Sequence, residues 1–393
     1  MNDVKQREIT LSLVPSAEEL ALRKTVFDLT ATFGPDYYEK VNSEKRSPSE
    51  LWKIMADNGF LGVHLPEEYG GGGMGLQELT TVLEETGAAG VPLLGLLVSP
   101  GIIGTILARH GTLEQKDKWL RRIADGTMKF SFALTEPGAG SNSHRITTVA
   151  KREGDKYVVN GQKYYISGID ECDLFLLVTR TGVTENGRGQ LSLLMVDPDA
   201  PGLTRHPIQT ALEEPEKQFT LFFDNVEVPA ENLIGEEGKG LRVAFDGLNP
   251  ERILSAAVSV GVARYALDKA VAYAKERTVW DTPIGAHQAI AHPLAEAKIK
   301  LDLARLAMQK AAALYDAGLD AGEASNVAKL AAAEAGVFCL DHAIQTHGGN
   351  GVSREYQLAN YWFLARLQLI APVSREMILN FVAEHTLKLP RSY

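Results

Sequence analysis

Residues 132–142 read Phe-Ala-Leu-Thr-Glu-Pro-Gly-Ala-Gly-Ser-Asn and stand where the chain changes from helical to strand-like sequence. The stretch begins with strand formers and continues into a loop of small residues. Small residues allow backbone N–H groups to approach a ligand closely, which favours an anion-binding loop. A purely structural turn also explains Pro-Gly-Ala-Gly, so the stretch taken alone leaves both interpretations open.

A second segment follows about two dozen residues later, where residues 160–167 read Asn-Gly-Gln-Lys-Tyr-Tyr-Ile-Ser. Asn160-Gly161 is typical of a tight hairpin turn, and an aromatic pair and a hydroxyl come after it. An ordinary hairpin with Tyr165 in the core is the alternative to a ligand-binding role.

The sequence around these segments divides into helical, β and helical parts. From Ser16 to about Asp125 the apolar residues recur at helical spacing. Strand-forming runs follow, separated by turn residues such as Asn160-Gly161 and Asn186-Gly187. These runs are Tyr157–Val159, Leu174–Val178, Leu191–Val196 and Phe219–Phe223. After Gly240 an alanine-rich pattern predicts long antiparallel helices, broken near Thr282-Pro283 and at residues 348–351.

Composition narrows the functional classes. The 393 residues carry a net charge of −10, which disfavours nucleic acid as a partner. Cys172 and Cys339 lie far apart, so neither a disulfide framework nor a zinc cluster is expected, and a reducing cytoplasm fits best. The first 20 residues do not look like a targeting peptide. The apolar window 91–107 is interrupted by Pro and Gly and falls short of the roughly 20 residues of a membrane helix, so we expect a buried helix or turn and no membrane insertion.

In this order and layout, the two quoted segments resemble those of the acyl-CoA dehydrogenase family, and the resemblance covers nearly the whole chain. It implies a mainly α fold with a central β domain. The expected parts are an N-terminal helical domain (1–125), a middle β-barrel or sandwich domain (126–236) and a C-terminal four-helix bundle (237–393). It also implies FAD as the cofactor.

The resemblance further implies which residues of the middle part touch the flavin. The first segment would lie along its pyrimidine edge, and the second would place Tyr165 on one flavin face and the Ser167 hydroxyl on N5. Family members usually have Trp and Thr at these two places, and Tyr165 and Ser167 keep an aromatic plane and a hydroxyl donor. The expected cofactor contacts here are Phe132, Leu134, Thr135, Gly140, Ser141, Tyr165, Ile166 and Ser167.

Two later segments are similar to family loops that reach the FAD of a neighbouring subunit. Residues 276–288, Glu-Arg-Thr-Val-Trp-Asp-Thr-Pro-Ile-Gly-Ala-His-Gln, supply Arg277 for the pyrophosphate. Residues 345–351, Gln-Thr-His-Gly-Gly-Asn-Gly, would cradle the adenine end. The contacts implied are Arg277, Trp280, Gln288, Gln345, Gly348 and Gly349, and they imply a homo-oligomer, dimer or tetramer. His287 and His347 lack the spacing of metal ligands, so no metal is expected.

The catalytic base is the most informative position. Many family members carry a Glu in a Tyr-Glu-Gly-Thr segment near the C-terminus, but the aligned residues here are Ala371-Pro372-Val373-Ser374. A minority branch, which includes the isovaleryl-CoA and long-chain enzymes, instead has its base on an earlier helix directly before an arginine. Here Glu251 precedes Arg252. The alternative is that Pro250-Glu251 simply begins a helix, where an acid favours the helix dipole.

The resemblance therefore implies α,β-dehydrogenation of an acyl-CoA thioester to the 2-enoyl-CoA, with the α-proton passing to Glu251 and the β-hydride to flavin N5. Ser141 and Arg252 are expected to contact the substrate, and Ser374 and Glu376 the cofactor. The resemblance also implies a role in fatty acid metabolism and an electron-transferring flavoprotein as electron acceptor. A flavin monooxygenase or desulfinase of the same fold, or a non-enzymatic helical scaffold, are the alternatives.

Overall fold

The computed structural model describes residues 14–185, 189–212 and 214–391. The chain divides into two compact units. The sheet unit comprises Lys45–Met74 and Leu94–Leu248, and the helical unit comprises the chain up to Glu44, Gly75–Leu93 and the chain from Asn249 onward. The helical segment predicted from Ser16 to about Asp125 is divided between the two units.

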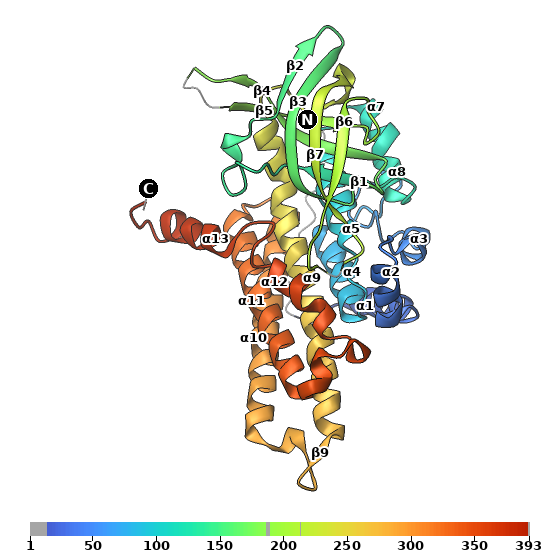
Figure 1. Ribbon diagram of the computed structural model, residues 1–393, viewed down its shortest axis with the longest axis vertical. Helices are drawn as coiled ribbons and strands as arrows, with labels where there is room; N and C mark the ends of the chain where they lie inside the picture. Colours follow the sequence, from blue (N-terminus) through green and yellow to red (C-terminus); the bar gives the residue numbers. More distant parts are fainter. Residues whose placement is uncertain (1–13, 186–188, 213, 392–393) are drawn as a thin grey trace. The chain divides into compact units, whose positions relative to one another are not determined.

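The sheet unit contains one mixed sheet, whose green to yellow-green strands are seen in Figure 1. Its strand order is β6-β7-β3-β2-β4-β5-β8, with β1 paired in parallel to β4. All four predicted strand runs lie within these strands, which confirms them. The strands are β1 (Phe130–Ala133), β2 (Val149–Glu153), β3 (Lys156–Ser167), β4 (Leu174–Val183), β5 (Gly189–Val196), β6 (Leu203–Ile208), β7 (Gln218–Pro229) and β8 (Leu233–Ile234).

Side chains alternate along a strand, so each central strand contributes residues to both faces of the sheet. Both of these faces are buried. Phe175 and Leu177 of β4 belong to a core formed with Tyr157 of β3 and Leu221 of β7. Leu176 and Val178 of the same strand point to the other face, into a second core. That second core includes Ile102, Ile106, Leu107 and Trp119 from the helices of the sheet unit. Continuous apolar runs in β4 and β5 follow from this two-sided burial.

The helices of the sheet unit include residues 94–107 of the apolar window, which are helical and largely buried, as expected. Part of it is a π-helix, η2 (Leu97–Gly104), that includes Pro100. The other helices of this unit are α3 (Ser49–Asp57), α5 (Leu94–Leu96), α6 (Thr105–His110), α7 (Leu113–Gln115), η3 (Lys116–Leu120) and α8 (Arg121–Ala124).

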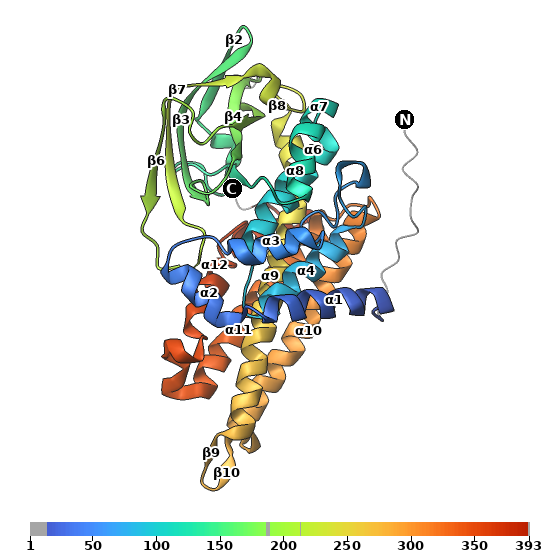
Figure 2. The same cartoon turned by 90° about the vertical axis from the view of Figure 1, so that its right-hand side faces the viewer.

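The helical unit is dominated by three long helices, two of which, α10 and α11, pack against each other. Figure 2 shows α9 and α10 running side by side to the short β9–β10 hairpin that joins them. The elements are α1 (Ala17–Ala31), α2 (Gly34–Ser43), α4 (Leu76–Ala88), α9 (Gly240–Glu276), β9 (Thr278–Val279), β10 (Thr282–Pro283), α10 (Gln288–Asp316), α11 (Gly322–His347), α12 (Trp362–Leu367) and α13 (Arg375–Phe381). The predicted breaks near 282–283 and at 348–351 are confirmed.

One local prediction is wrong, and one alternative interpretation is excluded. Asn160-Gly161 is not a hairpin turn but lies inside β3, where Gly161 has φ +143° at a shift of register against β7. Pairing with β2 and β7 on both sides overrides the local turn preference. Pro250 does not begin a helix either, because α9 starts at Gly240 and Pro250 lies in its interior. The predicted turn at Asn186-Gly187 falls outside the described residues.

No helix in the described part of the chain is long and apolar enough to cross a membrane.

Candidate active site

The loop after β1 is fixed at its base by a buried carboxylate. Glu136 accepts hydrogen bonds from the backbone N–H groups of Thr147 (2.7 Å) and Thr148 (3.0 Å) and pairs with Lys163 at 3.0 Å. Burial by itself would raise the pKa of Glu136, but Lys163 and these hydrogen bonds bring it down to about 2. The acid of the Thr-Glu-Pro-Gly sequence is therefore an anchor of the loop.

The tip of the same loop is open. A Cβ atom added to Gly138 or Gly140 would meet no atom within 4 Å, and both residues are exposed. Ser141 is also exposed, while Phe132, Leu134 and Thr135 are half-buried. A ligand therefore has room to approach the backbone N–H groups of the loop, as the sequence predicted.

Hydrogen bonding brings the second predicted segment to the first, because the Tyr164 N–H donates to the Thr135 carbonyl at 2.9 Å. Tyr165 is 54% exposed and has φ +56°, so it does not lie in the core. The register of β3 against β7 shifts between Lys163 and Ile166, which turns the Tyr165 ring outward. Ile166 is 1% exposed and packs in the sheet core, so only its backbone can face a ligand.

Ser167 ends this strand and begins a short polar chain that the sequence did not reveal. Its hydroxyl donates to Gln218 Oε1 at 2.9 Å, and Gln218 Nε2 donates to Glu214 Oε1 at 3.1 Å. Burial and the neighbouring Glu216 raise the pKa of Glu214 to about 8. Gln218 fixes the hydroxyl of the residue that was expected to meet the flavin.

In the helical unit, Glu251 lies within α9 and is half-buried. Burial raises the pKa of its carboxyl to about 7, against the opposing influence of the charges of Arg252 and Lys329. Arg252 donates instead to Asn249 Oδ1 at 2.9 Å. Glu251 is far from the first turn of α9, so an interaction with the helix N-terminus does not explain why an acid stands at this position.

Two buried polar contacts join the C-terminal segment around Pro372 to the long helices. Lys329 of α11, 1% exposed, donates to the Val373 carbonyl at 2.6 Å. Ser255, one turn after Glu251, donates to the side chain of buried Gln368. Sequence reasoning missed Lys329, although a lone cation among Ala328, Ala332 and Ala333 was an available signal.

Ser374 and Glu376, the expected cofactor contacts of this segment, lie at the start of α13. The Ser374 side chain caps the helix by accepting from the Met377 N–H at 3.3 Å. Glu376 is exposed in the first turn, and Pro372 is also exposed. The Ser374 hydroxyl therefore has a structural task in addition to the expected one.

The two segments expected to meet a neighbouring subunit lie together in the helical unit. Tyr273 of α9 stacks on His347 with ring centroids 4.2 Å apart, and its hydroxyl accepts from Asn350 Nδ2 at 3.1 Å. The Tyr273 carbonyl accepts from the Arg277 N–H at 2.9 Å. His347 is therefore a structural residue of this junction. The remaining expected contacts are all exposed: Arg277, Trp280, Gln288, Gln345, Gly348 and Gly349.

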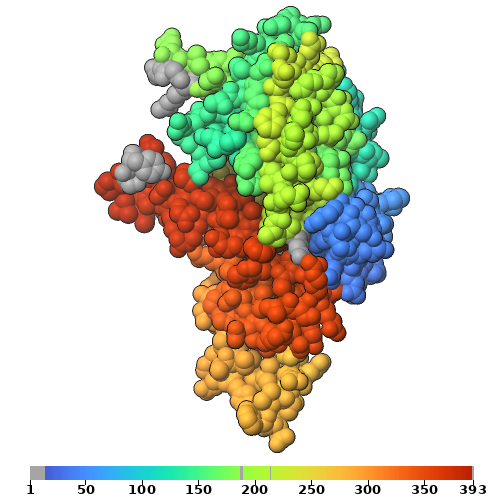
Figure 3. Space-filling view, in the orientation of Figure 1, coloured from blue at the N-terminus to red at the C-terminus, as the bar shows by residue number. Residues whose placement is uncertain are grey.

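Trp280 is 86% exposed, and it lies in the β9–β10 hairpin where α9 gives way to α10. Figure 3 shows the yellow-orange surface of this end of the helical unit, and no other part of the chain covers it on the face shown. A Cβ atom added to Gly348 or Gly349 would also meet nothing within 4 Å.

These features fit FAD. An exposed aromatic ring (Tyr165), hydroxyls, an open glycine loop and an exposed guanidinium are the groups that an isoalloxazine ring and a pyrophosphate need. Within residues 14–185, 189–212 and 214–391, no cluster of three or more His, Cys, Asp or Glu side chains is suited to a metal ion.

Comparisons with known proteins identify the family of the chain. Family profiles match residues 16–127 (acyl-CoA dehydrogenase, N-terminal domain), 131–226 (middle domain) and 238–387 (C-terminal domain). The chain is 52% identical over 384 residues to the acyl-CoA dehydrogenase FadE12 of Mycobacterium tuberculosis, covering 97% of this chain and 99% of the relative.

Solved structures give the same result. Butyryl-CoA dehydrogenase from Megasphaera elsdenii superimposes with a TM-score of 0.90 at 27% identity, covering 96% of this chain and 100% of the other. A glutaryl-CoA dehydrogenase in complex with glutaryl-CoA gives a TM-score of 0.91 at 29% identity, covering 97% and 98%. With all three family domains matched along one chain, this protein belongs to the acyl-CoA dehydrogenase family and is an FAD-dependent oxidoreductase.

Proposed function

We propose that the protein removes the hydrogens from Cα and Cβ of an acyl-CoA thioester to give the 2-enoyl-CoA, with Glu251 as the base that takes the α-proton. The observation that carries this proposal is the position of the Glu251 carboxyl, half-buried in the interior of α9 and beyond its first turn, where burial raises its pKa to about 7. The chain has Pro372 where many relatives have their base, and Glu251 is the carboxylate that replaces it.

The raised pKa suits the task of Glu251. A general base works best when its pKa lies near the working pH, since it is then ionised and still basic. A bound acyl-CoA would remove further water from Glu251 and raise its pKa again. Arg252 donates to Asn249, and its charge only partly offsets the effect of burial on Glu251. We assign its guanidinium to the CoA part of the substrate, together with Ser141.

FAD supplies the acceptor for the hydride that leaves the β-carbon. Our proposal for the protein's own part is that backbone groups of Phe132, Leu134 and Ile166 orient the flavin, and that the Tyr165 ring covers one face. The Ser167 hydroxyl, fixed by Gln218, would meet N5. The remaining proposed contacts to FAD within the same subunit are Thr135, Gly140, Ser141, Ser374 and Glu376.

A homo-oligomer, dimer or tetramer, is part of the proposal. An 86% exposed Trp280 beside an exposed Arg277 is unusual for a monomer surface, and a neighbouring subunit with its FAD would cover both. Gln288, Gln345, Gly348 and Gly349 would contact the same neighbouring cofactor. Oligomer assembly and FAD binding would then be linked.

The biological setting is a proposal as well. We assign the protein to fatty acid metabolism in the cytoplasm, with an electron-transferring flavoprotein as the electron acceptor. The two free thiols, Cys172 and Cys339, are consistent with a reducing compartment.

The test is an anaerobic titration of the purified protein with a panel of saturated CoA thioesters that differ in chain length and branching. At least one thioester should bleach the flavin absorbance and yield the corresponding 2-enoyl-CoA. Protein that carries FAD yet is bleached by no member of the panel would contradict dehydrogenation and favour a monooxygenase or desulfinase reaction. Colourless protein that cannot be loaded with FAD would contradict a flavoenzyme.

A further inference from the structure

Lys329 lies in a place where a lysine is costly. It belongs to α11, is 1% exposed, and is surrounded along the helix by buried Ala328, Ala332 and Ala333. A buried ammonium group must recover its lost hydration through protein contacts, so a lysine in such a position has a specific partner. Burial lowers the pKa of Lys329 to about 8, which leaves it charged at neutral pH.

One partner of this charge is a backbone carbonyl. The Nζ of Lys329 donates to the Val373 carbonyl at 2.6 Å, in the turn that contains Pro372. Its charge and that of Glu251 also influence each other, since each group acts on the pKa of the other. The same lysine therefore connects the proposed base on α9 to the segment in which many relatives carry theirs.

A second contact supports this connection. Gln368, at the start of the same C-terminal segment, is 6% exposed and accepts from the hydroxyl of Ser255. Ser255 follows Glu251 by one helical turn and lies on the same side of α9. The segment 368–373 is thus held at one end by the helix of the base and at the other by Lys329.

We propose that Lys329 is a positioning residue for the dehydrogenation: its buried ammonium group holds the turn at Pro372–Val373, next to the segment that Ser255 bonds to the helix of Glu251, and supplies positive charge to the surroundings of that carboxylate. This proposal rests on the assignment of Glu251 as the base. Lys329 acts through Glu251 and through the turn, and no contact of its own with the substrate is required.

The charged groups around the site come from three helices. On α9, Arg252 acts on Glu251 and is itself bonded to Asn249. On α11, Lys329 acts on Glu251. At the start of α13, Arg375 pairs with Glu334 at 3.0 Å. Lys329 is therefore the cation from a neighbouring helix whose removal should act most directly on Glu251.

The experiment compares Lys329→Met and Lys329→Arg with the parent as FAD-loaded proteins. Flavin reduction by the best thioester of the panel is followed anaerobically by stopped flow between pH 5.5 and 9. Loss of the charge should raise the pKa of Glu251. If the pKa of Glu251 rises by about one unit, the acidic limb of the pH–rate profile moves to higher pH, and the rate at pH 6 falls about tenfold. Lys329→Arg should restore the limb to its parental pH and the rate to within about threefold.

Lys151→Met, which removes an exposed lysine of β2, is the control and should leave the profile unchanged. A Lys329→Met profile that superimposes on that of the parent would overturn the proposal, as would a Lys329→Arg profile displaced as far as that of Lys329→Met. If Lys329→Met does not fold, Lys329→Gln is measured in its place under the same criteria.

Failure of this inference can be told apart from failure of the proposed function. If Glu251→Gln is inactive while Lys329→Met keeps the parental profile, only the role of Lys329 is wrong. If Glu251→Gln reduces its flavin at the parental rate, the assignment of the base is wrong and the role of Lys329 falls with it.

Discussion

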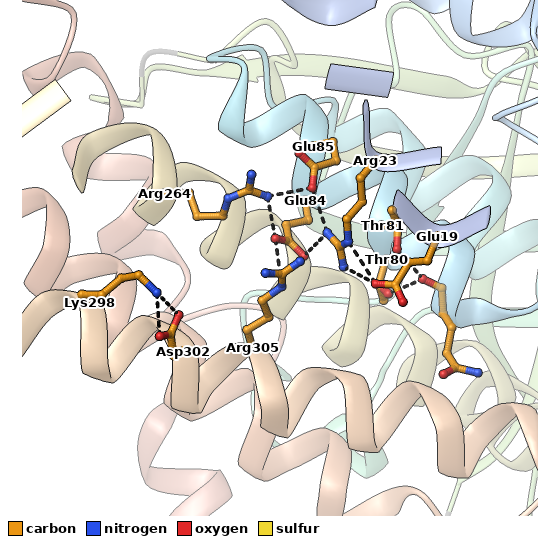
Figure 4. A network of polar contacts seen from close by, with 11 residues as sticks. Glu19, Arg23, Thr80, Thr81, Glu84, Glu85, Arg264, Lys298, Asp302 and Arg305 are labelled. Carbon is orange, nitrogen blue, oxygen red and sulfur yellow. Dashed lines mark hydrogen bonds and ion pairs between the residues drawn. The ribbon is translucent and has the colours of Figure 1, made fainter. Parts of the chain in front are cut away.

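Glu84 and Glu251 are glutamates of the same helical unit with opposite electrostatic surroundings. Glu84 of α4 is fully buried and contacts three arginines: Arg23 at 3.0 Å, Arg264 at 2.6 Å and Arg305 at 3.2 Å (Figure 4). Burial alone would raise the pKa of Glu84, but the three positive charges reverse the effect and hold it below its ordinary value. For Glu251 the two nearby cations do not offset burial, and its pKa rises to about 7.

The difference separates a structural carboxylate from a reactive one. A carboxylate saturated by guanidinium groups stays ionised, binds its helices together and has no basicity left for a substrate. A carboxylate whose burial is only partly compensated can exchange a proton near neutral pH. Burial of a glutamate is therefore not informative by itself, and the number and geometry of its cationic partners decide what it can do.

The largest effect on stability should come from Glu84→Gln. The substitution removes the carboxylate that three arginines share, although Arg23 and Arg264 keep their pairing with Glu85. Breaking a buried ion pair in this way costs about 3–5 kcal/mol of unfolding free energy. Urea denaturation of the FAD-loaded protein measures the loss, and Glu153→Gln on the exposed strand β2 is the matched control. A loss no greater than that of the control would mean that the arginine cluster contributes little to stability.

Arginines can be contrasted in the same way as the two glutamates. Arg23 is buried and paired within the chain, whereas Arg277 is exposed and is proposed to serve a neighbouring FAD. Arg277→Ala should weaken FAD binding about 10- to 100-fold, the expected loss of a charged hydrogen bond, and should shift the protein toward smaller oligomers. FAD titration of apoprotein and size-exclusion chromatography measure the two effects, and unchanged affinity would remove Arg277 from the cofactor site.

Glu214 provides a third electrostatic environment, buried and hydrogen-bonded to Gln218 but next to another acid. The pKa of Glu214 is raised from its ordinary value of 4.5 to about 8 in the folded protein. Between these two pH values the folded state therefore keeps a proton that the unfolded state has released. Stability should therefore fall as pH rises from about 4.5 to about 8. Glu214→Gln should reduce this fall by at least about 1 kcal/mol, which melting curves at pH 5.5 and 8.5 would reveal. Parallel pH profiles for variant and parent would show that Glu214 does not titrate as described.

The smallest effect is expected at Pro372. Proline has no N–H, whereas an N–H at this position would polarise the thioester carbonyl in the proposed reaction. Pro372→Ala restores a donor while Lys329 continues to hold the adjacent Val373 carbonyl. Flavin reduction should therefore stay at the parental rate or rise by up to about tenfold. Loss of activity with fold and FAD retained would assign the proline a shaping role in the pocket.

Much of the fold follows from sequence pattern, because period and composition report burial directly. The strand runs in β4 and β5 and the alanine-rich helices were predicted for this reason. Asn160-Gly161 was mistaken for a turn because local preference was overridden by pairing with strands distant in sequence. Pro250-Glu251 was the alternative helix start because a proline and an acid both suit a first helical turn, but α9 already begins at Gly240.

The sequence predicted only those parts of the candidate site that belong to a recognisable motif. The openness of Gly138, Gly140 and Tyr165 agrees with the expected flavin segments, while the individual contacts and the domain boundaries at 125 and 236 stay predictions. The partner of Lys329 and the Ser167–Gln218–Glu214 chain could not be found, because each includes a contact between residues more than 40 positions apart in sequence. Lys329 itself stood out only as a lone cation among alanines.

The assignment of Glu251 as the base is tested most directly by single-turnover flavin reduction in Glu251→Gln. This substitution keeps the size of the side chain and removes its basicity, so FAD and CoA thioesters should bind almost normally. Anaerobic stopped-flow bleaching with the best thioester should be at least about a hundredfold slower than in the parent, the usual minimum for the loss of a positioned base. A rate close to that of the parent would contradict the role of Glu251 and require another acid or another reaction.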